Sequence, residues 1–330
     1  MGLFSRKPKM IVPATVALIN SNDVANIKDY VVLDVETTGL DPSVNRIIEV
    51  AAVRIQDGQE TGRYQTFVNP KTKVPKGITN LTGIKNADIK NGKPYEEMAQ
   101  DVSDFIGDLP IVAHNAPFDV KFVAAAMSLI GREYSTPAVD TVGLAKLAHP
   151  NLVNYKLNTL IRHLSLTDHE QTHRAMDDVL CTKKLFDNCR RIICANNSVH
   201  AQKKTVDKAL ESVESAKTAV DVFLAYGNAE ATLSEAMAMD PDSTEIVFGD
   251  VGKFLTKNFS PAIHNVLTKE FEKEKKAIQK LKTRKAIVSR IERFQNVYNA
   301  NADKMTGPQK TKLKNYVSDL MKVCDMVAPR

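Results

Sequence analysis

Two acidic side chains, Asp34 and Glu36, stand two positions apart at the end of an apolar run, Tyr30–Val35. Residues i and i+2 of a β-strand project from the same face, so a strand here would hold the two carboxylates side by side. Two such charges repel and raise each other's pKa unless a cation lies between them. The alternative is a pair of solvated acids on an exposed edge strand. However, Val31–Val35 is typical of a buried strand, in which unpaired acids are costly, and a metal site would remove that cost.

A further acid, Asp119, closes the motif HNAPFD at residues 114–119. The motif follows a short apolar strand, Ile111–Ala113, and opens a helix, which places Asp119 in the first helical turn. The helix dipole favours an anion at this position. Taken alone, the motif therefore predicts either an acid that compensates the dipole or a functional carboxylate.

The third motif, HRAMDD at residues 173–178, combines a histidine with two acids. Five residues of a regular helix turn through about 500°, so His173 and Asp178 could not share a helical face. His173 must lie before the helix, or at its start, if it is to point where Asp178 points, and the polar stretch 168–172 permits that. A lone histidine is more often structural, and Asp177 competes with Asp178 for any role.

The motifs DVETTGL (from Asp34), HNAPFD and HRAMDD gain meaning from their order along the chain. Together they resemble the histidine branch of the four-acid (DEDD) 3′–5′ exonuclease superfamily, which has a ribonuclease H-like fold. The resemblance covers about residues 28–192 and is strongest to the proofreading ε-type exonucleases of bacterial DNA polymerase III. Supporting matches are FVNP at 67–70, NLTGI at 80–84 and VDTVGLAK from Val139.

This resemblance implies four catalytic acids that also bind metal: Asp34, Glu36, Asp119 and Asp178. The expected cofactors are two divalent cations, Mg²⁺ or Mn²⁺, because an all-oxygen ligand set suits hard cations rather than zinc. Two such ions can clamp the attacking and leaving oxygens of a phosphodiester. His173 would be the catalytic general base, for which an intrinsic pKa of about 6.5 is suitable at neutral pH. The family spacing, a histidine and then an aspartate after four residues, selects the second aspartate of HRAMDD.

The resemblance also implies contacts with the terminal nucleotides of a substrate. Backbone groups at 37–39 would meet the last nucleotide. Leu40 and Phe118 would pack on the terminal bases, although either could instead belong to the core. The expected substrate-binding residues are Thr37, Thr38, Gly39, Leu40, His114, Asn115 and Phe118.

The implied activity is metal-dependent hydrolysis at DNA 3′ ends, which releases 5′-mononucleotides in proofreading or repair. Nothing in the three motifs decides the sugar, so an exoribonuclease is the alternative with the same chemistry. A non-catalytic nucleic-acid-binding or polymerase-docking subunit is the alternative of another class, and the five intact catalytic positions count against it. The expected partner is a nucleic acid with a free 3′ end, DNA in preference to RNA.

The elements that position these residues alternate between strand and helix patterns. Residues 70–92 are rich in Gly, Pro, Asn and Lys and predict mostly loop, and Asp57-Gly58 is a hairpin signal. A hairpin followed by strands that alternate with helices predicts an α/β fold, a mixed central sheet flanked by helices. The expected strands are Tyr30–Val35, Ile47–Ile55, Tyr64–Val68, Ile111–Ala113 and Val139–Asp140. The expected helices are Tyr95–Ile106, Phe118–Ile130, Val142–Ala148, Leu157–Leu164 and Ala175–Ile193.

A chain of 330 residues is too long for one minimal domain. Apolar residues recur near heptad spacing from Leu267 to Tyr298, broken at Glu274 and Lys285. This favours a long packed helix or a helical hairpin over a coiled coil. The expected segments are an N-terminal extension at 1–27, the exonuclease domain at 28–194, a polar linker at 195–202 and a mostly α-helical C-terminal region of unknown role at 203–330.

The net charge of +6 is distributed unevenly along the chain. Residues 201–250 carry 4 basic and 10 acidic side chains, whereas residues 251–330 carry 18 basic and 7 acidic ones. The basic segment Lys269–Arg293 could follow a phosphate backbone. It could also dock a polymerase or another protein, or form a solvated helix with ion pairs four residues apart.

Cysteine usage and hydropathy bear on the compartment. Four cysteines in a chain of this size do not predict a disulfide framework, so reduced, buried thiols are expected. No apolar run approaches about 20 residues and no small-residue cleavage site follows the N-terminal stretch, so we expect neither a spanning helix nor a signal peptide. The sequence therefore predicts a cytoplasmic protein with no membrane partner.

Overall fold

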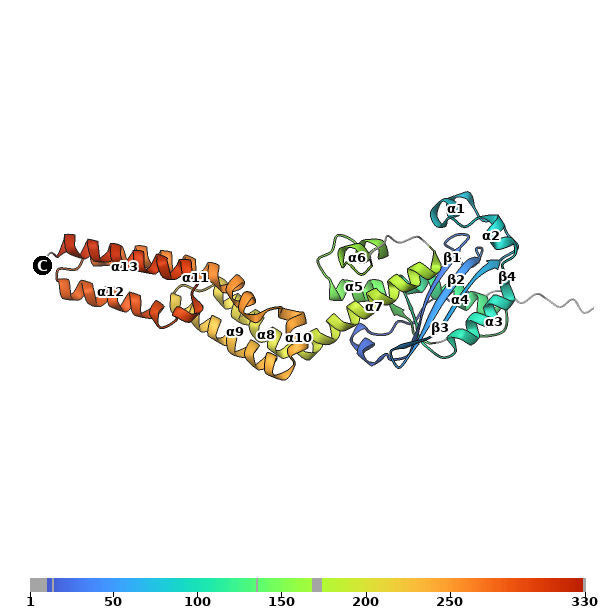
Figure 1. Ribbon diagram of the computed structural model, residues 1–330, viewed down its shortest axis with the longest axis horizontal. Coiled ribbons are helices and arrows are strands. Elements are labelled where there is room, and N and C mark those ends of the chain that lie inside the picture. The colour runs from blue at the N-terminus through green and yellow to red at the C-terminus, as the bar shows by residue number, and fades with distance from the viewer. Residues whose placement is uncertain (1–10, 14, 135, 168–173, 329–330) are drawn as a thin grey trace, which may run out of the picture. The chain divides into compact units, whose positions relative to one another are not determined.

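The computed structural model describes residues 11–328 except 14, 135 and 168–173. The chain forms two compact units that divide between Ile193 and Cys194. We call them the N-terminal unit and the C-terminal unit and describe each by itself (Figure 1). The segment boundaries expected from the sequence stay predictions.

The N-terminal unit contains a mixed six-stranded sheet with the strand order β4-β3-β2-β1-β5-β6. The neighbours β3, β2 and β1 are antiparallel, whereas β4 pairs parallel with β3, β5 with β1 and β6 with β5. This confirms the expected mixed sheet. The strands are β1 (Tyr30–Thr37), β2 (Ile47–Gln56), β3 (Gln59–Asn69), β4 (Lys93–Pro94), β5 (Ile111–Ala113) and β6 (Val139–Asp140).

The hairpin between β2 and β3 has the two-residue turn that the sequence predicted. Gln56 pairs with Gln59, and the turn residues Asp57 and Gly58 have φ angles of 49° and 75°. Two positive φ values in a row match the right-handed twist of the flanking strands, and Asp-Gly accepts them at low cost.

Two hydrophobic cores cover the two faces of the sheet. Alternate residues of β1 point to opposite sides, so Val31 and Leu33 join one core and Tyr30 and Val32 the other. The next residue of the second set is Asp34. The strand pattern therefore places Asp34 on the face that the C-terminal helices of this unit cover.

Seven α-helices flank the sheet in the part of this unit that the structure describes. The first core packs on α3 and α4, and the second packs on α5, α6 and α7. Residues 11–27 also belong to this unit, because Leu18 bridges Ala138 beside β6. The helices are α1 (Lys76–Thr82), α2 (Asn86–Lys90), α3 (Tyr95–Ile106), α4 (Ala116–Ser128), α5 (Thr141–Ala148), α6 (Leu157–His163) and α7 (Ala175–Ser198).

The prediction that residues 70–92 are mostly loop was wrong. Helices α1 and α2 occupy about half of this stretch, and Gly83 ends α1 with a φ of 75°. Ile84 and Ile89 are buried against Ile48 of β2 in a small separate core. These few apolar contacts hold two short helices that the Gly- and Lys-rich composition concealed.

The polar stretch 195–202, expected as a linker, is helical. Helix α7 continues to Ser198 and α8 begins at His200. Ala195 and Val199 lie four residues apart and are both buried, which gives this polar stretch an apolar helical face.

The described residues of the C-terminal unit form helices joined by short connections, which confirms the expected mostly α-helical region. The ends of its helices are set by capping residues. The Thr218 side chain accepts from the Asp221 backbone at the start of α9, and Asp250 and Thr283 cap α11 and α12. The helices are α8 (His200–Glu214), α9 (Ala219–Met239), α10 (Pro241–Phe248), α11 (Val251–Ile278), α12 (Arg284–Asn299) and α13 (Gly307–Val327).

The apolar stripe from Leu267 to Tyr298 lies on two helices. Leu267 and Ile278 are buried on α11, and Ile291 and Tyr298 are buried on α12. The chain reverses between Ile278 and Arg284. A helical hairpin, rather than a coiled coil, is therefore confirmed.

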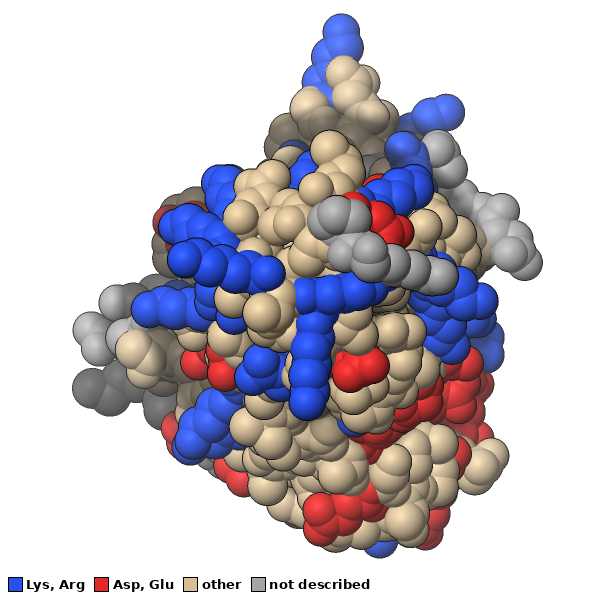
Figure 2. Space-filling model, turned by 90° about the vertical axis from the view of Figure 1, so that its left-hand side faces the viewer, with Lys and Arg blue, Asp and Glu red and all other residues tan. Residues whose placement is uncertain are grey.

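The C-terminal unit separates its charges by helix. Acidic residues outnumber basic ones on α8–α10, whereas basic residues outnumber acidic ones from α11 onward. Figure 2 shows Lys and Arg side chains gathered over one part of a face and Asp and Glu side chains gathered over another.

Two further expectations concern membranes and thiols. None of the described helices is both long enough and apolar enough to cross a membrane. All four cysteines are free thiols, and three of them are buried. Burial raises the pKa of Cys181 to about 11 and that of Cys189 to about 12, so these two thiols are unreactive at neutral pH.

Candidate active site

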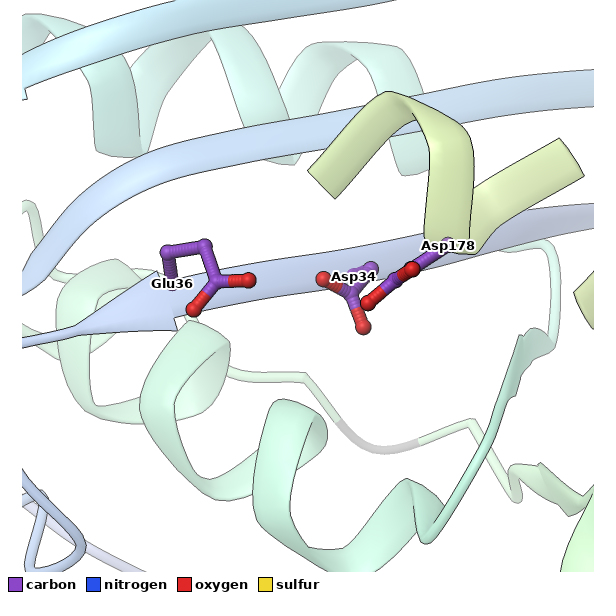
Figure 3. Close-up of side chains that lie close together, drawn as sticks. All are labelled: Asp34, Glu36 and Asp178. Carbon is purple, nitrogen blue, oxygen red and sulfur yellow. The ribbon is translucent and has the colours of Figure 1, made fainter. Parts of the chain in front are cut away.

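Three carboxylates from two distant parts of the chain meet beside β1. One carboxylate oxygen each of Asp34, Glu36 and Asp178 lies within 4.8 Å of the other two. In Figure 3, Asp34 and Glu36 follow each other along the strand, and Asp178 approaches from a helix above them. The strand alternation described above explains the meeting, because it turns both strand acids toward α7.

The fourth predicted acid, Asp119, lies in the first turn of α4 and is 2% exposed. Its Oδ1 accepts a hydrogen bond from the backbone N–H of Val35, between the two strand acids, at 3.2 Å. The structure thus brings Asp119 against the same strand end. Its role as a metal ligand stays a prediction.

Like charges and burial raise the pKa values of these acids. Burial is the main cause for Asp34, whose pKa is raised well above its usual range, and the charges of Asp119 and Asp178 add to it. Burial and the Asp178 charge raise the pKa of Glu36 to about 8. Burial also raises the pKa of Asp119, against the opposing hydrogen bond from Val35. Such a group of acids is stable in its charged form only with a cation.

The donor set suits a divalent metal. Asp34, Glu36 and Asp178 offer only carboxylate oxygens, the ligands that Mg²⁺ and Mn²⁺ prefer. No histidine or cysteine belongs to this group among the described residues, so zinc is a poorer fit.

A cleft of about 990 Å³ opens beside the acids. Asp34 and Asp178 line it together with His114, Asn115 and Leu81. Its wall also carries side chains that the sequence gave no reason to single out: Lys146, Tyr155, Lys156, Asn158 and Thr159. The two lysines supply positive charge next to an acidic centre, as a phosphate group would require.

His114 is engaged within the protein. Its Nε2 lies 3.0 Å from the carbonyl oxygen of Tyr155 and its Nδ1 lies 2.9 Å from Oγ1 of Thr141. Because a carbonyl only accepts, Nε2 carries the hydrogen, and burial lowers the pKa of the ring. His114 therefore positions the cleft wall that contains Tyr155.

Asn115 begins α4 in the left-handed conformation, with a φ of 69°. Its backbone N–H and that of Ala116 donate to Oδ1 of Asp140, at 3.0 and 3.3 Å. The same oxygen accepts from the N–H of Val142 at the start of α5. One carboxylate that the motif analysis passed over thus fixes the starts of two helices beside the site.

The residues after Glu36 form a tight turn at the end of β1. Oγ1 of Thr37 donates to the carbonyl of Gly39 at 2.7 Å, and a Cβ at Gly39 would lie 2.6 Å from Oδ1 of Asn45. Leu40 is 84% exposed and so does not belong to the core. Phe118 is half-buried, with its ring centroid 5.0 Å from that of Phe122. Thr38 donates its backbone N–H to the carbonyl of Arg46.

A buried acid that none of the three motifs contains, Glu49, pairs with Glu36 across the β1–β2 ladder. Glu49 is 1% exposed, and the Arg174 guanidinium binds its two oxygens at 2.9 and 3.1 Å. Arg174 also lies over the Phe67 ring, 5.2 Å from its centroid. Because Arg174 directly precedes α7, this pair holds the start of the helix that carries Asp178. The signal in the sequence was a lone acid within the apolar strand IIEVAAV.

His173, the predicted general base, lies outside the described residues. Its position relative to the acids and its catalytic role stay predictions.

Comparison with known proteins agrees with the geometry. The family model described as "Exonuclease" matches residues 31–186. The chain is 34% identical over 201 residues to the PolC-type DNA polymerase III of Clostridium perfringens. The matched region covers 61% of this chain and 14% of that polymerase. It is 38% identical over 163 residues to the 3′-5′ exonuclease DinG of Bacillus subtilis. The matched region covers 49% of this chain and 17% of DinG. The chain thus spans less than a fifth of the length of these relatives.

Among solved structures, E. coli Exonuclease I in complex with a dA16 oligonucleotide is similar with a TM-score of 0.42 and 20% identity, over 48% of this chain and 42% of that one. The family match covers all three predicted motifs and the sheet that carries them. Residues 31–186 therefore belong to the four-acid 3′–5′ exonuclease family, with its ribonuclease H-like fold.

Proposed function

We propose that this protein is a metal-dependent 3′–5′ exonuclease that removes 5′-mononucleotides one by one from DNA 3′ ends. The observation that carries this proposal is the group of three carboxylates with oxygens within 4.8 Å of one another. They lie beside an open cleft, in a segment that matches the exonuclease family. Crowded acids of this kind cost stability, and metal-assisted phosphodiester hydrolysis gives a reason to retain them.

The proposed metal ligands are Asp34, Glu36, Asp119 and Asp178. When bound, two Mg²⁺ or Mn²⁺ ions would stabilise the charge on the attacking and leaving oxygens. Asp119, anchored to the backbone of β1, and Asp178, held through Arg174, would fix the ligand positions. His173 would accept the proton of the attacking water as general base.

The proposed substrate contacts lie around the cleft. Backbone groups of the turn at 37–39 would meet the terminal nucleotide, and the exposed Leu40 and the half-buried Phe118 would contact the terminal bases. Asn115 and His114 both line the cleft, and His114 would also position the wall that contains Tyr155. Lys146 and Lys156 are new candidates for contact with substrate phosphates.

DNA is the proposed substrate because two relatives are named as a DNA polymerase III and a 3′-5′ exonuclease. We also propose a role in proofreading or repair and a cytoplasmic location. Residues 203–330 would bind a polymerase or another protein partner.

The test compares matched DNA and RNA oligonucleotides, labelled at the 5′ end, with the full chain in Mg²⁺, in Mn²⁺ and in a chelator. We expect a ladder that shortens by single nucleotides from the 3′ end of DNA, with 5′-mononucleotides as the product and no release in the chelator. Asp34→Asn and Asp178→Asn should abolish release, and Asp177→Asn, the adjacent acid on α7, serves as the matched control.

Each contrary result has a distinct meaning. Digestion by Asp34→Asn at the wild-type rate would overturn the site assignment, and loss of activity in Asp177→Asn alone would exchange the two aspartates. Shortening of RNA but not of DNA would make the protein an exoribonuclease. Metal-independent binding with no release would make it a non-catalytic binding subunit.

A further inference from the structure

A dense group of basic side chains occurs where α11 turns into α12. Residues 275–285, KKAIQKLKTRK, contain six basic residues and no acidic one. They cover the last turn of α11, the connection and the first turn of α12. We call this group the basic cap: Lys275, Lys276, Lys280, Lys282, Arg284 and Lys285.

Two members of the basic cap serve the fold. Arg284 forms an ion pair with Asp325 at 2.7 Å and donates to the carbonyl of Ala328, which ties the start of α12 to the end of α13. Lys275 lies over the ring of Phe271, 5.8 Å from its centroid. These two side chains have a structural use that requires no partner.

The other four members of the basic cap have none of these uses. Lys276, Lys280, Lys282 and Lys285 are exposed, and no described acidic side chain forms an ion pair with them. Elsewhere in this unit basic groups do find acids, as Arg290 does at Glu274 and Lys203 does at Asp207. The four lysines of the basic cap therefore repel one another without compensation.

The two helix ends at the basic cap favour opposite charges. Lys276 lies in the last turn of α11, where the helix dipole favours a cation. Lys285 lies in the first turn of α12, where the dipole opposes a cation. Helix stability thus explains one of these charges and not the other, and an anionic ligand would account for both.

The chemistry of the basic cap indicates a repeating phosphate rather than a nucleobase. Lysines are flexible point charges that suit phosphodiesters without fixed geometry, and DNA presents one phosphate for about every 3.4 Å of each strand. Stacking on bases requires exposed aromatic rings. None of the described aromatic side chains of the C-terminal unit is exposed.

We propose that the basic cap binds the phosphate backbone of nucleic acid, independently of sequence, as a second binding site outside the exonuclease cleft. The choice of nucleic acid over other polyanions rests on the proposed nuclease function of the same chain. Exposed Met326 and Val327 at the end of α13 give anionic lipid as the competing partner, and the experiment includes it.

The experiment measures binding by the full chain in a chelator, so that cleavage does not contribute. The probe is a fluorescent DNA duplex of several helical turns, titrated over a range of salt concentrations. The test variant changes Lys276, Lys280, Lys282 and Lys285 to Gln. The matched control changes four exposed lysines elsewhere in the same unit to Gln: Lys204, Lys208, Lys217 and Lys253.

We expect the test variant to bind at least about tenfold more weakly at low salt, because each phosphate contact contributes about 0.9 to the slope of log affinity against log salt. The magnitude of that slope should fall by about 3 to 4 for four lost contacts. The control variant should bind within twofold of wild type. Glutamine retains helix propensity, and circular dichroism verifies that both variants fold.

Equal binding by the test and control variants would overturn the proposal. So would tighter, cap-dependent binding to vesicles with phosphatidylserine than to the duplex at the same salt, which would assign the basic cap to lipid. Release of nucleotides from a short 3′-labelled oligonucleotide in Mg²⁺ is measured separately and should be unchanged in both variants. Binding of the duplex that depends on the basic cap, without release of nucleotides by the wild type, would support this proposal. The same result would contradict the proposed exonuclease function.

Discussion

The N-terminal and C-terminal units place their charged side chains in opposite ways. The N-terminal unit buries Glu49, Asp119 and Asp178 within one site, whereas no charged side chain is buried among the described residues of the C-terminal unit. Buried like charges oppose folding and persist where chemistry requires them. Surface charges cost little, so they indicate recognition only where they gather without compensation.

The strongest test of this difference is Asp34→Asn. Loss of this proposed metal ligand should lower nucleotide release by about 10³-fold, since a bound cation supplies several kcal/mol of transition-state stabilisation. The same change should increase the free energy of unfolding in a chelator, because an amide removes one of the mutually repelling charges. Parallel loss of activity and stability would show that Asp34 has a structural role. The proposed difference between the buried charges of the N-terminal unit and the surface charges of the C-terminal unit would then no longer hold.

The second test concerns Glu49, the buried acid that forms an ion pair with Arg174. Arg174→Met leaves the Glu49 carboxylate buried without its cation, which should cost about 2 kcal/mol of stability. Because the pair holds the start of α7, activity should fall by about 10- to 100-fold. Chemical denaturation and initial rates measure the two effects.

Addition of Glu49→Gln to Arg174→Met should restore most of the stability. The exposed pair Arg63–Glu60 of β3 is the matched control, and Arg63→Met should cost less than about 1 kcal/mol. Simple additivity of the Arg174 and Glu49 substitutions would contradict the assigned pairing.

The third test uses pH. Folding raises the pKa of Glu36 from 4.5 to about 8. The folded state therefore holds this proton at pH values where the unfolded state has released it, so stability falls as pH rises between these two values. In a chelator, the thermal midpoint of the N-terminal unit should decrease by several degrees over this window.

Saturating Mg²⁺ or Mn²⁺ should flatten that pH profile, because the cation replaces the proton. Without metal, Glu36→Gln should make the profile less steep, and the raised pKa values of Asp34 and Asp119 should account for the slope that is left. A metal-free midpoint that rises with pH would show that the acids are not crowded as described. Differential scanning calorimetry at a series of pH values makes both measurements.

The smallest effect concerns the C-terminal unit. The Tyr298 hydroxyl donates to Glu270 at 2.9 Å, and Glu270 also accepts from the N–H of Ala219. Tyr298→Phe should cost about 1 kcal/mol in this unit alone. Nucleotide release from a short oligonucleotide should stay at the wild-type rate, and a reduced rate would show that the units depend on each other.

Local periodicity predicts one part of the site, because the alternation of a strand places Asp34 and Glu36 together. The resemblance to the exonuclease family, through its spacing after the histidine, selects Asp178, which the structure brings to them. The mixed sheet follows similarly from a hairpin signal and alternating patterns. Such signals require only a few neighbouring residues.

The rest depended on contacts between residues far apart in sequence. Arg174 and Glu49 are separated by 125 positions, and no local pattern specifies that meeting. The roles of Asp140 and Tyr155 likewise arise from the packing of loops on helices. The helices within 70–92 depend on burial against β2, which composition does not reveal.

The exposure of Leu40 at the end of β1 has an optical consequence. The chain contains no tryptophan, so Leu40→Trp would introduce a single indole, at a position 84% open to solvent in the wild type. Its fluorescence would report only on events at that strand end, against a background of tyrosine emission. A tryptophan in place of Phe294, in the core of the other unit, would give a second, separate signal. The folding of each half of the molecule could then be followed by emission from one chosen residue.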